Sequence, residues 1–197
     1  MPDNSPMLRL LQDRVSVPAR MLTEPGPTIE ETREAIRAAV SAPDHGNLRP
    51  WHFVVVRGDS RTQLGDLFGA ALKRRNPDAT EAEISNERQK AYRAPMVIIV
   101  FIKTVLDNPK VPVTEQITSG GAAAQNILLA FEAMGYSSIV LTGENSRDEG
   151  LKAEFGIADT DVIIGMIYVG TPPERKPNKR RLDGEDFEGH FRIWTAE

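Results

Sequence analysis

Seven consecutive apolar residues, MVIIVFI at positions 96–102, place the strongest single constraint on the fold. A strand with one solvated face alternates apolar and polar side chains, whereas this segment is apolar on both faces. Ala94-Pro95 directly precedes it and marks its start. The segment therefore predicts a central strand that is buried on both sides.

Three further apolar segments, at 51–56, 136–141 and 161–170, have the length and composition of strands. Helical patterns lie between them, so the chain consists of four apolar strands separated by helices. In three places a Ser or Thr and a Glu three residues later form a predicted capping box, which satisfies free backbone N–H groups at a helix start. The predicted helices span residues 7–13, 28–40, 60–74, 80–92, 115–134 and 146–155, and the capping boxes start at Thr28, Thr80 and Ser146.

A helix is predicted over residues 115–134, EQITSGGAAAQNILLAFEAM. The side chains in its first half are mostly small, and those in its second half are mostly large and apolar. A helix that is apolar nearly all round is expected to be buried on all sides. Its small residues permit close approach of another subunit, a partner helix or a flat ligand. A central core helix is compatible with all three.

The loop before the first strand is stiff and rich in hydrogen-bonding side chains. Pro43 and Pro50 bracket it, and each fixes its own φ and restricts the residue before it. His45, Asn47 and Arg49 lie between the two prolines, and Trp51, the predicted core anchor, follows them. Such a loop is either a solvated polar turn or a surface for a polar ligand edge. The loop alone leaves both interpretations open.

Two basic segments are candidates for binding an anion. Arg14 and Arg20 flank Ser16 after the first predicted helix, and two guanidinium groups can bind an anionic group bidentately. On these residues alone, a solvated basic turn explains the pattern better. The second segment lies in the tail at 171–197, which is rich in Pro and charge. Its basic residues are Arg175, Lys176, Lys179, Arg180 and Arg181, and its aromatic residues are Phe187, Phe191 and Trp194.

Composition excludes several classes of function. The net charge is −4, which argues against nucleic-acid binding by phosphate neutralisation. The chain has no Cys, so thiol catalysis and Cys-ligated metals are excluded, and its three His are not spaced as a helical zinc pair. No apolar run approaches the ~20 residues that span a bilayer, and no signal peptide is visible, so the cytoplasm is the expected compartment. The 197 residues suit one domain with residues 171–197 as an extended tail.

Taken together, the motifs resemble those of the nitroreductase family of flavin-dependent oxidoreductases. Arg14-Val15-Ser16 with Arg20 resembles the family's R-R-S-x-R entry motif, and residues 42–51, APDHGNLRPW, resemble its A-P-S-x-x-N-x-Q-P-W loop. Residues 121–135 resemble its long central helix, and 170–172 its Gly-Thr-Pro turn. The chain has Val15 in place of the second Arg and Arg49 in place of Gln. Val140-Leu141-Thr142 stands where short members have a Trp-Arg-Ser-like run.

The resemblance implies an α+β fold in three layers, with a mostly antiparallel central sheet flanked by helices and a long buried central helix. It also implies an intertwined homodimer with two FMN sites at the interface. Cations would hold the FMN phosphate, hydrogen-bonding groups would hold its pyrimidine edge, and Arg49 is a candidate cation near N1. The candidate cofactor-binding residues are Arg14, Val15, Ser16, Arg20, His45, Asn47, Arg49, Leu141, Thr142, Arg180 and Arg181.

The activity implied by the resemblance is hydride transfer from NADH or NADPH through FMN to a nitroaromatic, quinone or similar small acceptor, in a ping-pong cycle. The flavin carries this chemistry, so no catalytic side chain and no metal is expected. Two alternatives stay open. One is a flavin enzyme of other chemistry on the same fold, such as a reductive dehalogenase or a flavin-fragmenting enzyme. The other is a non-catalytic protein that binds flavin or acts by interaction.

Overall fold

The centre of the molecule is a four-stranded sheet. The computed structural model describes residues 5–178 and 187–195. Its strands are β1 (Trp51–Arg57), β2 (Met96–Ile102), β3 (Ser137–Leu141) and β4 (Val162–Gly170), in the order β1-β2-β4-β3, and every neighbouring pair is antiparallel. All seven residues of β2 are buried, which confirms the predicted central strand.

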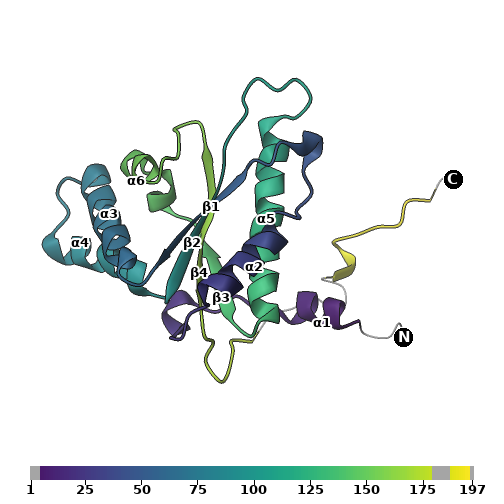
Figure 1. Ribbon diagram of the computed structural model, residues 1–197, viewed down its shortest axis with the longest axis horizontal. Coiled ribbons are helices and arrows are strands. Elements are labelled where there is room, and N and C mark those ends of the chain that lie inside the picture. Colours follow the sequence, from purple (N-terminus) through teal and green to yellow (C-terminus); the bar gives the residue numbers. More distant parts are fainter. Residues whose placement is uncertain (1–4, 179–186, 196–197) are drawn as a thin grey trace.

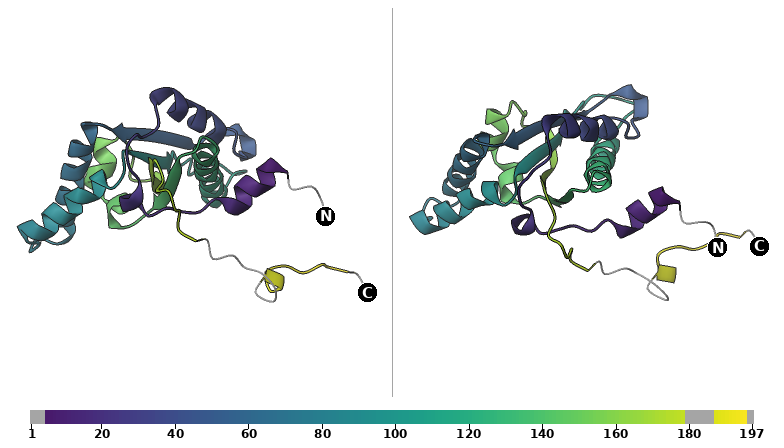
Figure 2. Two further views of the ribbon diagram at one scale, coloured as in Figure 1. Left: turned by 90° about the horizontal axis from the view of Figure 1, so that it is seen from below. Right: turned by 60° about the horizontal axis from the view of Figure 1, so that its bottom comes forward.

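Helices cover both faces of this sheet and make three layers (Figures 1 and 2). On one face lie α3 (Ser60–Arg75), α4 (Glu81–Arg88) and α6 (Glu149–Glu154), and on the other lie α2 (Ile29–Ala39) and α5 (Val113–Ala133). Successive residues of β2 point to opposite faces of the sheet, so alternate residues of MVIIVFI enter two different cores. Val97, Ile99 and Phe101 pack under α3 and α6, while Met96, Ile98 and Val100 pack against α2 and α5. The predicted α+β architecture is confirmed.

Two of the three predicted capping boxes are present. At the start of α2 the Glu31 backbone N–H donates to Thr28 Oγ1 at 3.1 Å, and Thr28 N–H donates to Glu31 Oε2 at 2.8 Å. Thr80 and Glu83 form the same arrangement at the start of α4. A 3₁₀ turn, η3 (Gln89–Tyr92), continues α4 to the end of the predicted helix.

The third predicted capping box, at Ser146, is wrong. Residues Glu144–Arg147 form the 3₁₀ turn η4, and Asp148 caps α6 by accepting the Leu151 N–H at 2.8 Å. Asp148 is the better cap because Arg74 of α3 also binds its carboxylate, with Nε and Oδ2 3.0 Å apart. Ser146 instead donates to the Gly143 carbonyl.

The prediction that the central helix is buried on all sides is wrong for the single chain. One face of α5 packs on the sheet through Ala123, Ile127 and Phe131, which are fully buried. The opposite face is exposed, and because its residues recur about every fourth position they share one stripe. This α5 stripe consists of Thr114, Ile117, Thr118, Gly121 and Gln125.

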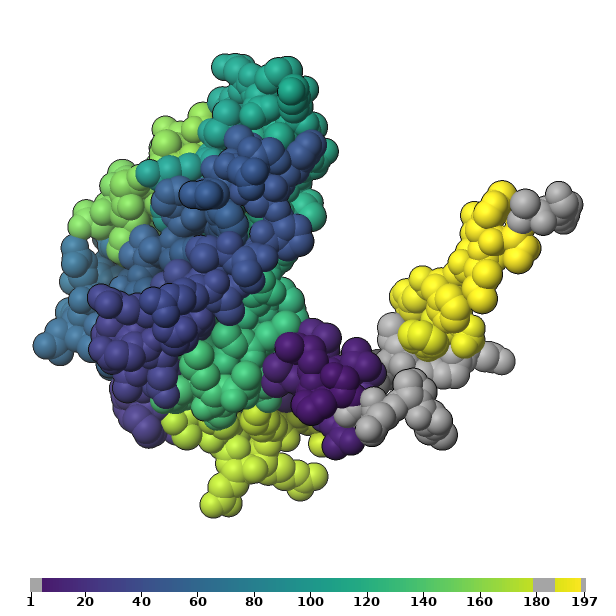
Figure 3. Space-filling view, turned by 45° about the vertical axis from the view of Figure 1, so that its right-hand side comes forward, coloured from purple at the N-terminus to yellow at the C-terminus, as the bar shows by residue number. Residues whose placement is uncertain are grey.

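Both chain ends contribute little to the core. The helix α1 (Pro6–Asp13) has no buried residue. Residues 187–195 extend away from the body (Figures 1 and 3), and Phe187, Phe191 and Trp194 are 49, 51 and 79 % exposed.

Candidate functional site

The segment that carries Arg14, Val15, Ser16 and Arg20 lies beside β3. The Val17 N–H donates to the Ser138 carbonyl at 3.3 Å, and Val17 is fully buried. Val15 packs against the same core, which gives its apolar side chain a structural role. Ser16 and Arg20 are exposed, and Arg14 Nη1 donates to Ser16 Oγ at 3.4 Å. The segment therefore presents polar and cationic groups from a buried anchor.

Two adjoining cavities open where β3 ends. The smaller, of about 230 Å³, is lined by Arg20 from the 3₁₀ turn η1 (Ala19–Met21), together with Arg93 and Leu141. The larger, of about 300 Å³, shares Arg93 and Leu141 and extends to Thr142. The structure thus brings together three of the predicted site residues, Arg20, Leu141 and Thr142.

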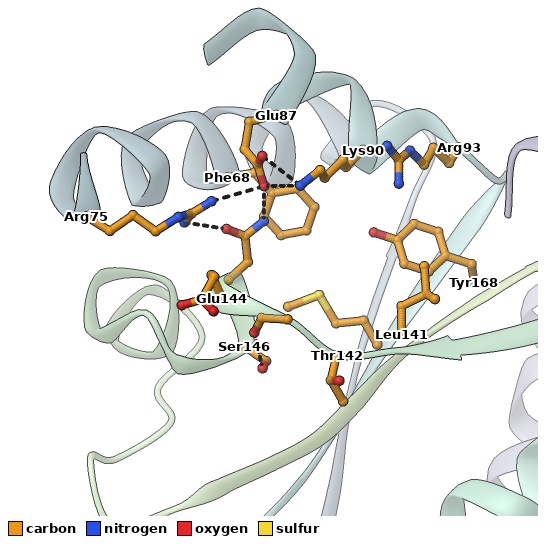
Figure 4. Close-up of a pocket in the computed structure, with 13 residues that line it drawn as sticks. Phe68, Arg75, Glu87, Lys90, Arg93, Leu141, Thr142, Glu144, Ser146 and Tyr168 are labelled. Atoms are coloured by element: carbon orange, nitrogen blue, oxygen red, sulfur yellow. Dashed lines mark hydrogen bonds and ion pairs between the residues drawn. The ribbon is translucent and has the colours of Figure 1, made fainter. Parts of the chain in front are cut away.

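The larger cavity, hereafter the β3-end cavity, also contains residues that the sequence did not identify (Figure 4). They come from α3, from α4 and η3, from η4 and from β4. They include Arg75, Glu87, Lys90, Arg93, Asn145 and Tyr168. In the sequence, Glu87 and Lys90 have the spacing of an ordinary surface pair on a polar helix, and Tyr168 belongs to an apolar strand.

Glu87 is the centre of a polar network in this cavity. Its carboxylate accepts from Lys90 Nζ at 2.7 Å and from Asn145 Nδ2 at 2.9 Å, and Arg75 Nη2 lies 3.3 Å away. Arg75 Nη1 also donates to Asn145 Oδ1 at 2.8 Å, which closes the network. Burial alone would raise the Glu87 pKa, but the bonds from Lys90 and Asn145 and the two nearby cations hold it below its ordinary value.

Tyr168 supplies a hydroxyl to the same cavity. The residue is 4 % exposed, and burial raises the pKa of its phenol to about 12, although the positive charge of Arg93 opposes the shift. Figure 4 shows its ring beside Leu141, with the hydroxyl directed into the cavity. The phenol is therefore a neutral hydrogen-bonding group over the whole physiological pH range.

The loop with His45, Asn47 and Arg49 lies elsewhere, on the N-terminal half of α5. His45 Nδ1 lies 2.5 Å from Glu115 Oε2, and Ser119 Oγ donates to the Pro43 carbonyl at 2.7 Å. Within the loop, the 3₁₀ turn η2 (His45–Asn47) precedes Arg49, whose N–H donates to Asp44 Oδ2 at 2.8 Å.

This loop is shaped rather than open. Asn47 and Arg49 have positive φ values of 52° and 49°, which non-glycine residues seldom adopt. At its end, Trp51 is 8 % exposed and its Nε1 donates to the Ala39 carbonyl, which confirms it as the core anchor.

The loop lies at the N-terminal end of α5, and β3 begins after the C-terminal end of that helix (Figure 1). Glu115 and Ser119 hold the loop at one end, whereas the Arg14–Arg20 segment lies against β3, which follows the other end. The two cavities where β3 ends are lined by Arg20, Leu141 and Thr142, and not by His45, Asn47 or Arg49.

Part of the predicted basic tail is described. Lys176 Nζ donates to Glu132 Oε1 of α5 at 2.6 Å, and Arg175 is exposed. Arg180 and Arg181, predicted for the cofactor, lie outside the described residues.

No group of three or more His, Asp or Glu among the described residues is arranged to hold a metal ion. No helix in the same ranges has the length and apolarity to cross a membrane.

Comparison with known proteins gives consistent results. The model of the Nitroreductase family matches residues 11–171. A Haemophilus influenzae protein named "Putative NAD(P)H nitroreductase" is 35% identical over 181 residues, which is 91% of this chain and 96% of that protein.

Solved structures also share the fold. A nitroreductase-like family protein from Bacillus cereus has a TM-score of 0.81 at 18% identity, with 100% of both chains covered. A nitroreductase with bound FMN from Bacteroides fragilis has a TM-score of 0.69 at 17% identity, with 97% of this chain and 100% of that chain covered.

Proposed function

The chain belongs to the nitroreductase family, and from this premise we propose that it is an FMN-dependent oxidoreductase that takes its electrons from NADH or NADPH. The name of the Haemophilus influenzae relative and the FMN in the Bacteroides fragilis structure support this proposal. Bound FMN supplies two-electron hydride chemistry, with a nitroaromatic, quinone or similar small molecule as acceptor in a ping-pong cycle. We place this activity in the cytoplasm.

The residues beside β3 fit one part of FMN. Arg14 and Arg20 are cations on a single segment, and no ion pair joins either to another described residue, so both are available to a phosphate. The β3-end cavity adds Lys90, Arg93 and the Tyr168 hydroxyl, which are donors suited to the carbonyl oxygens of a pyrimidine edge. Leu141 lines both cavities, and Thr142 lines the β3-end cavity. In this proposal Arg180 and Arg181 add to the phosphate site.

Arg20, Leu141 and Thr142 line the cavities where β3 ends, whereas His45, Asn47 and Arg49 line neither of them. We propose that a second copy of the chain supplies His45, Asn47 and Arg49 to each FMN, which makes the active form a homodimer. In a two-fold symmetric pair, the loop of one subunit can lie beside the β3 end of its partner, and the same contact is then repeated at the second site.

The small residue at the middle of the α5 stripe and separate exposed apolar side chains support the same assembly. The α5 stripe has Gly121 at its middle, where an added Cβ would have nothing within 4 Å, so another helix can approach closely. Met7 of α1 is 61 % exposed, and the aromatic residues of segment 187–195, which projects from the body in Figure 3, are exposed as well. Exposed apolar patches of this kind mark interaction sites.

The direct test is a visible spectrum of the purified protein, repeated after anaerobic addition of NADH or NADPH. We expect flavin absorption that bleaches with the nicotinamide and returns when an acceptor is added. If FMN is lost during purification, the protein is incubated with excess FMN, desalted and measured again. A colourless protein that retains no FMN after this treatment contradicts the proposal. Flavin that binds but is not reduced by either nicotinamide indicates a non-catalytic flavoprotein.

A further inference from the structure

The charged side chains around the β3-end cavity differ in how far they are exposed to solvent. Three cations line it, Arg75, Lys90 and Arg93. Two carboxylates line it as well, but Glu144 is 68 % exposed and lies 3.8 Å from Arg147, so solvent screens it. The Glu87 side chain is only 10 % exposed. Among the described lining residues, Glu87 therefore sets the negative charge that the cavity interior experiences.

The contacts of Glu87 fix more than one wall of the cavity. Lys90 lies one helical turn along from Glu87, and its Nζ is 2.7 Å from both carboxylate oxygens. Asn145 joins η4 to the same carboxylate, and Arg75 joins α3 to both Glu87 and Asn145. Figure 4 shows these side chains converging on one point at the roof of the cavity. The Lys90 ammonium is thus held at the cavity wall beside a carboxylate that it shares with Arg75.

Arg93 and Tyr168 differ from Lys90 in this respect. No ion pair joins Arg93 to another described residue, and no hydrogen bond is formed by the Tyr168 hydroxyl within the same part of the chain. Both groups are free to meet a ligand, whereas Lys90 and Arg75 already share a counter-charge. The electrostatic field that acts on the ligand consequently depends on whether Glu87 is ionised and present.

We propose that Glu87 is a positioning residue that holds Lys90 at the cavity wall and, by neutralising it, sets the reduction potential of the flavin bound there. This inference rests on the proposed function. Reduction by hydride adds negative charge to the pyrimidine edge of a flavin, so nearby positive charge favours the reduced form. Since the Glu87 side chain is only 10 % exposed, the loss of its charge is felt more strongly than at an open surface. Glu87 keeps the flavin potential lower than Lys90 and Arg75 would set it alone.

The test compares the flavin midpoint potential of four proteins loaded with FMN. Glu87→Gln keeps the shape and one acceptor oxygen, and removes the charge. We expect the ratio of affinities for reduced and oxidised FMN to rise roughly tenfold, which corresponds to a positive shift of about 30 mV for a two-electron couple. Lys90→Met should shift the potential in the negative direction, and the double variant should return it close to the wild-type value.

The opposite signs separate this role from a structural one. Loosening of the η4 wall would weaken FMN binding in all three variants and would not reverse the potential between Glu87→Gln and Lys90→Met. The matched control is Glu81→Gln, which makes the same charge change on the exposed first turn of α4 and should leave the potential unchanged.

The outcomes distinguish this inference from the proposed function. If the wild type binds FMN but Glu87→Gln does not raise the flavin midpoint potential, the role of Glu87 is contradicted and the proposed function is not. The same holds if Glu81→Gln raises the potential equally. A wild-type protein that retains no FMN contradicts the proposed function and, with it, this inference.

Discussion

Gly120 lies so close to Ile102 that a Cβ added to the glycine would be 2.8 Å from Ile102 Cγ2. The same Cβ would be 2.8 Å from Ile164 Cγ1, so the helix α5 crosses the sheet where only glycine fits. We expect Gly120→Ala to lower the free energy of unfolding by about 1–3 kcal/mol, because overpacking outweighs the better helix propensity of alanine. Urea unfolding followed by circular dichroism measures this change.

Gly121→Ala is the control for this prediction, since its Cβ meets nothing within 4 Å in the single chain. Any loss of stability in this variant should disappear as the protein concentration is lowered until both proteins are monomeric, because it would reflect weaker association. The loss in Gly120→Ala should be present at every concentration. Equal effects of the two substitutions contradict the close approach of α5 to the sheet.

The stripe of α5 gives a prediction about assembly. A leucine at Gly121 has room in the single chain but would push a second helix away, so Gly121→Leu should shift the protein from dimer to monomer. Analytical ultracentrifugation at several concentrations measures the equilibrium, and circular dichroism checks that the helix content is kept. The substitution Ala153→Leu is the control, since Ala153 is exposed on α6 at the opposite face of the sheet. A wild type that is monomeric at all concentrations contradicts the proposed homodimer.

Asp148 and Ser146 distinguish the observed helix cap from the predicted one. Asp148→Ala removes the cap of α6 and the partner of Arg74, and should cost about 0.5–2 kcal/mol of unfolding free energy. Ser146→Ala removes a hydroxyl that bonds only a nearby turn carbonyl, and should change it by less than about 0.5 kcal/mol. A larger cost at Ser146 than at Asp148 contradicts the assignment.

The Asp148 carboxylate also makes stability depend on acid. Burial would raise its pKa, but the bonds from Arg74 and the Leu151 N–H hold it below the ordinary value. A lowered pKa in the folded state gives stability that is present above the unfolded pKa of about 3.9 and is lost as the pH falls through the folded pKa. Asp148→Asn should therefore flatten the dependence of unfolding free energy on pH below about pH 4. An unchanged slope contradicts this prediction.

Tyr168 makes the corresponding prediction in alkali. Because burial raises the pKa of its phenol to about 12, it contributes stability that is present below the unfolded pKa of about 10 and is lost as the pH rises through the folded value. Tyr168→Phe should remove the last phase of the tyrosinate absorbance titration and reduce the loss of stability between about pH 10 and 12. A Tyr168→Phe titration that keeps this last phase assigns it to another tyrosine.

The sequence predicted the sheet because local pattern and final environment agree there. Seven apolar residues in β2 need two cores, and the structure provides both. The Thr28 and Thr80 caps were predictable for the same reason, since each box is closed within four residues. Ser146 failed because the choice between it and Asp148 depends on Arg74, which is 74 residues away from Asp148.

The site was less predictable than the fold. Glu87 and Lys90 have the spacing of an ordinary surface pair on a polar helix, and only the packing of η4 and α3 against them makes a buried network. The exposed stripe of α5 was missed because composition does not tell whether an apolar helix is covered by its own chain or by another. The motif residues at 14–20 and 45–49 gave no indication that Arg20 would line a cavity at the end of β3 and that His45, Asn47 and Arg49 would not.

The central claim, an FMN site completed by a second copy, is tested most directly by complementation. Arg20→Ala and Arg49→Ala should each weaken FMN retention, since one removes a cation beside β3 and the other a cation of the opposing loop. The two variants are co-expressed with different tags, and the mixed dimer is purified through both tags.

In a mixed symmetric dimer, one site carries both substitutions and the other carries neither. The account predicts about half of the wild-type FMN content in the mixed dimer, together with reduction of that flavin by NADH or NADPH. Mixed dimers that hold no more FMN than either variant alone, or variants that do not co-purify, would contradict it.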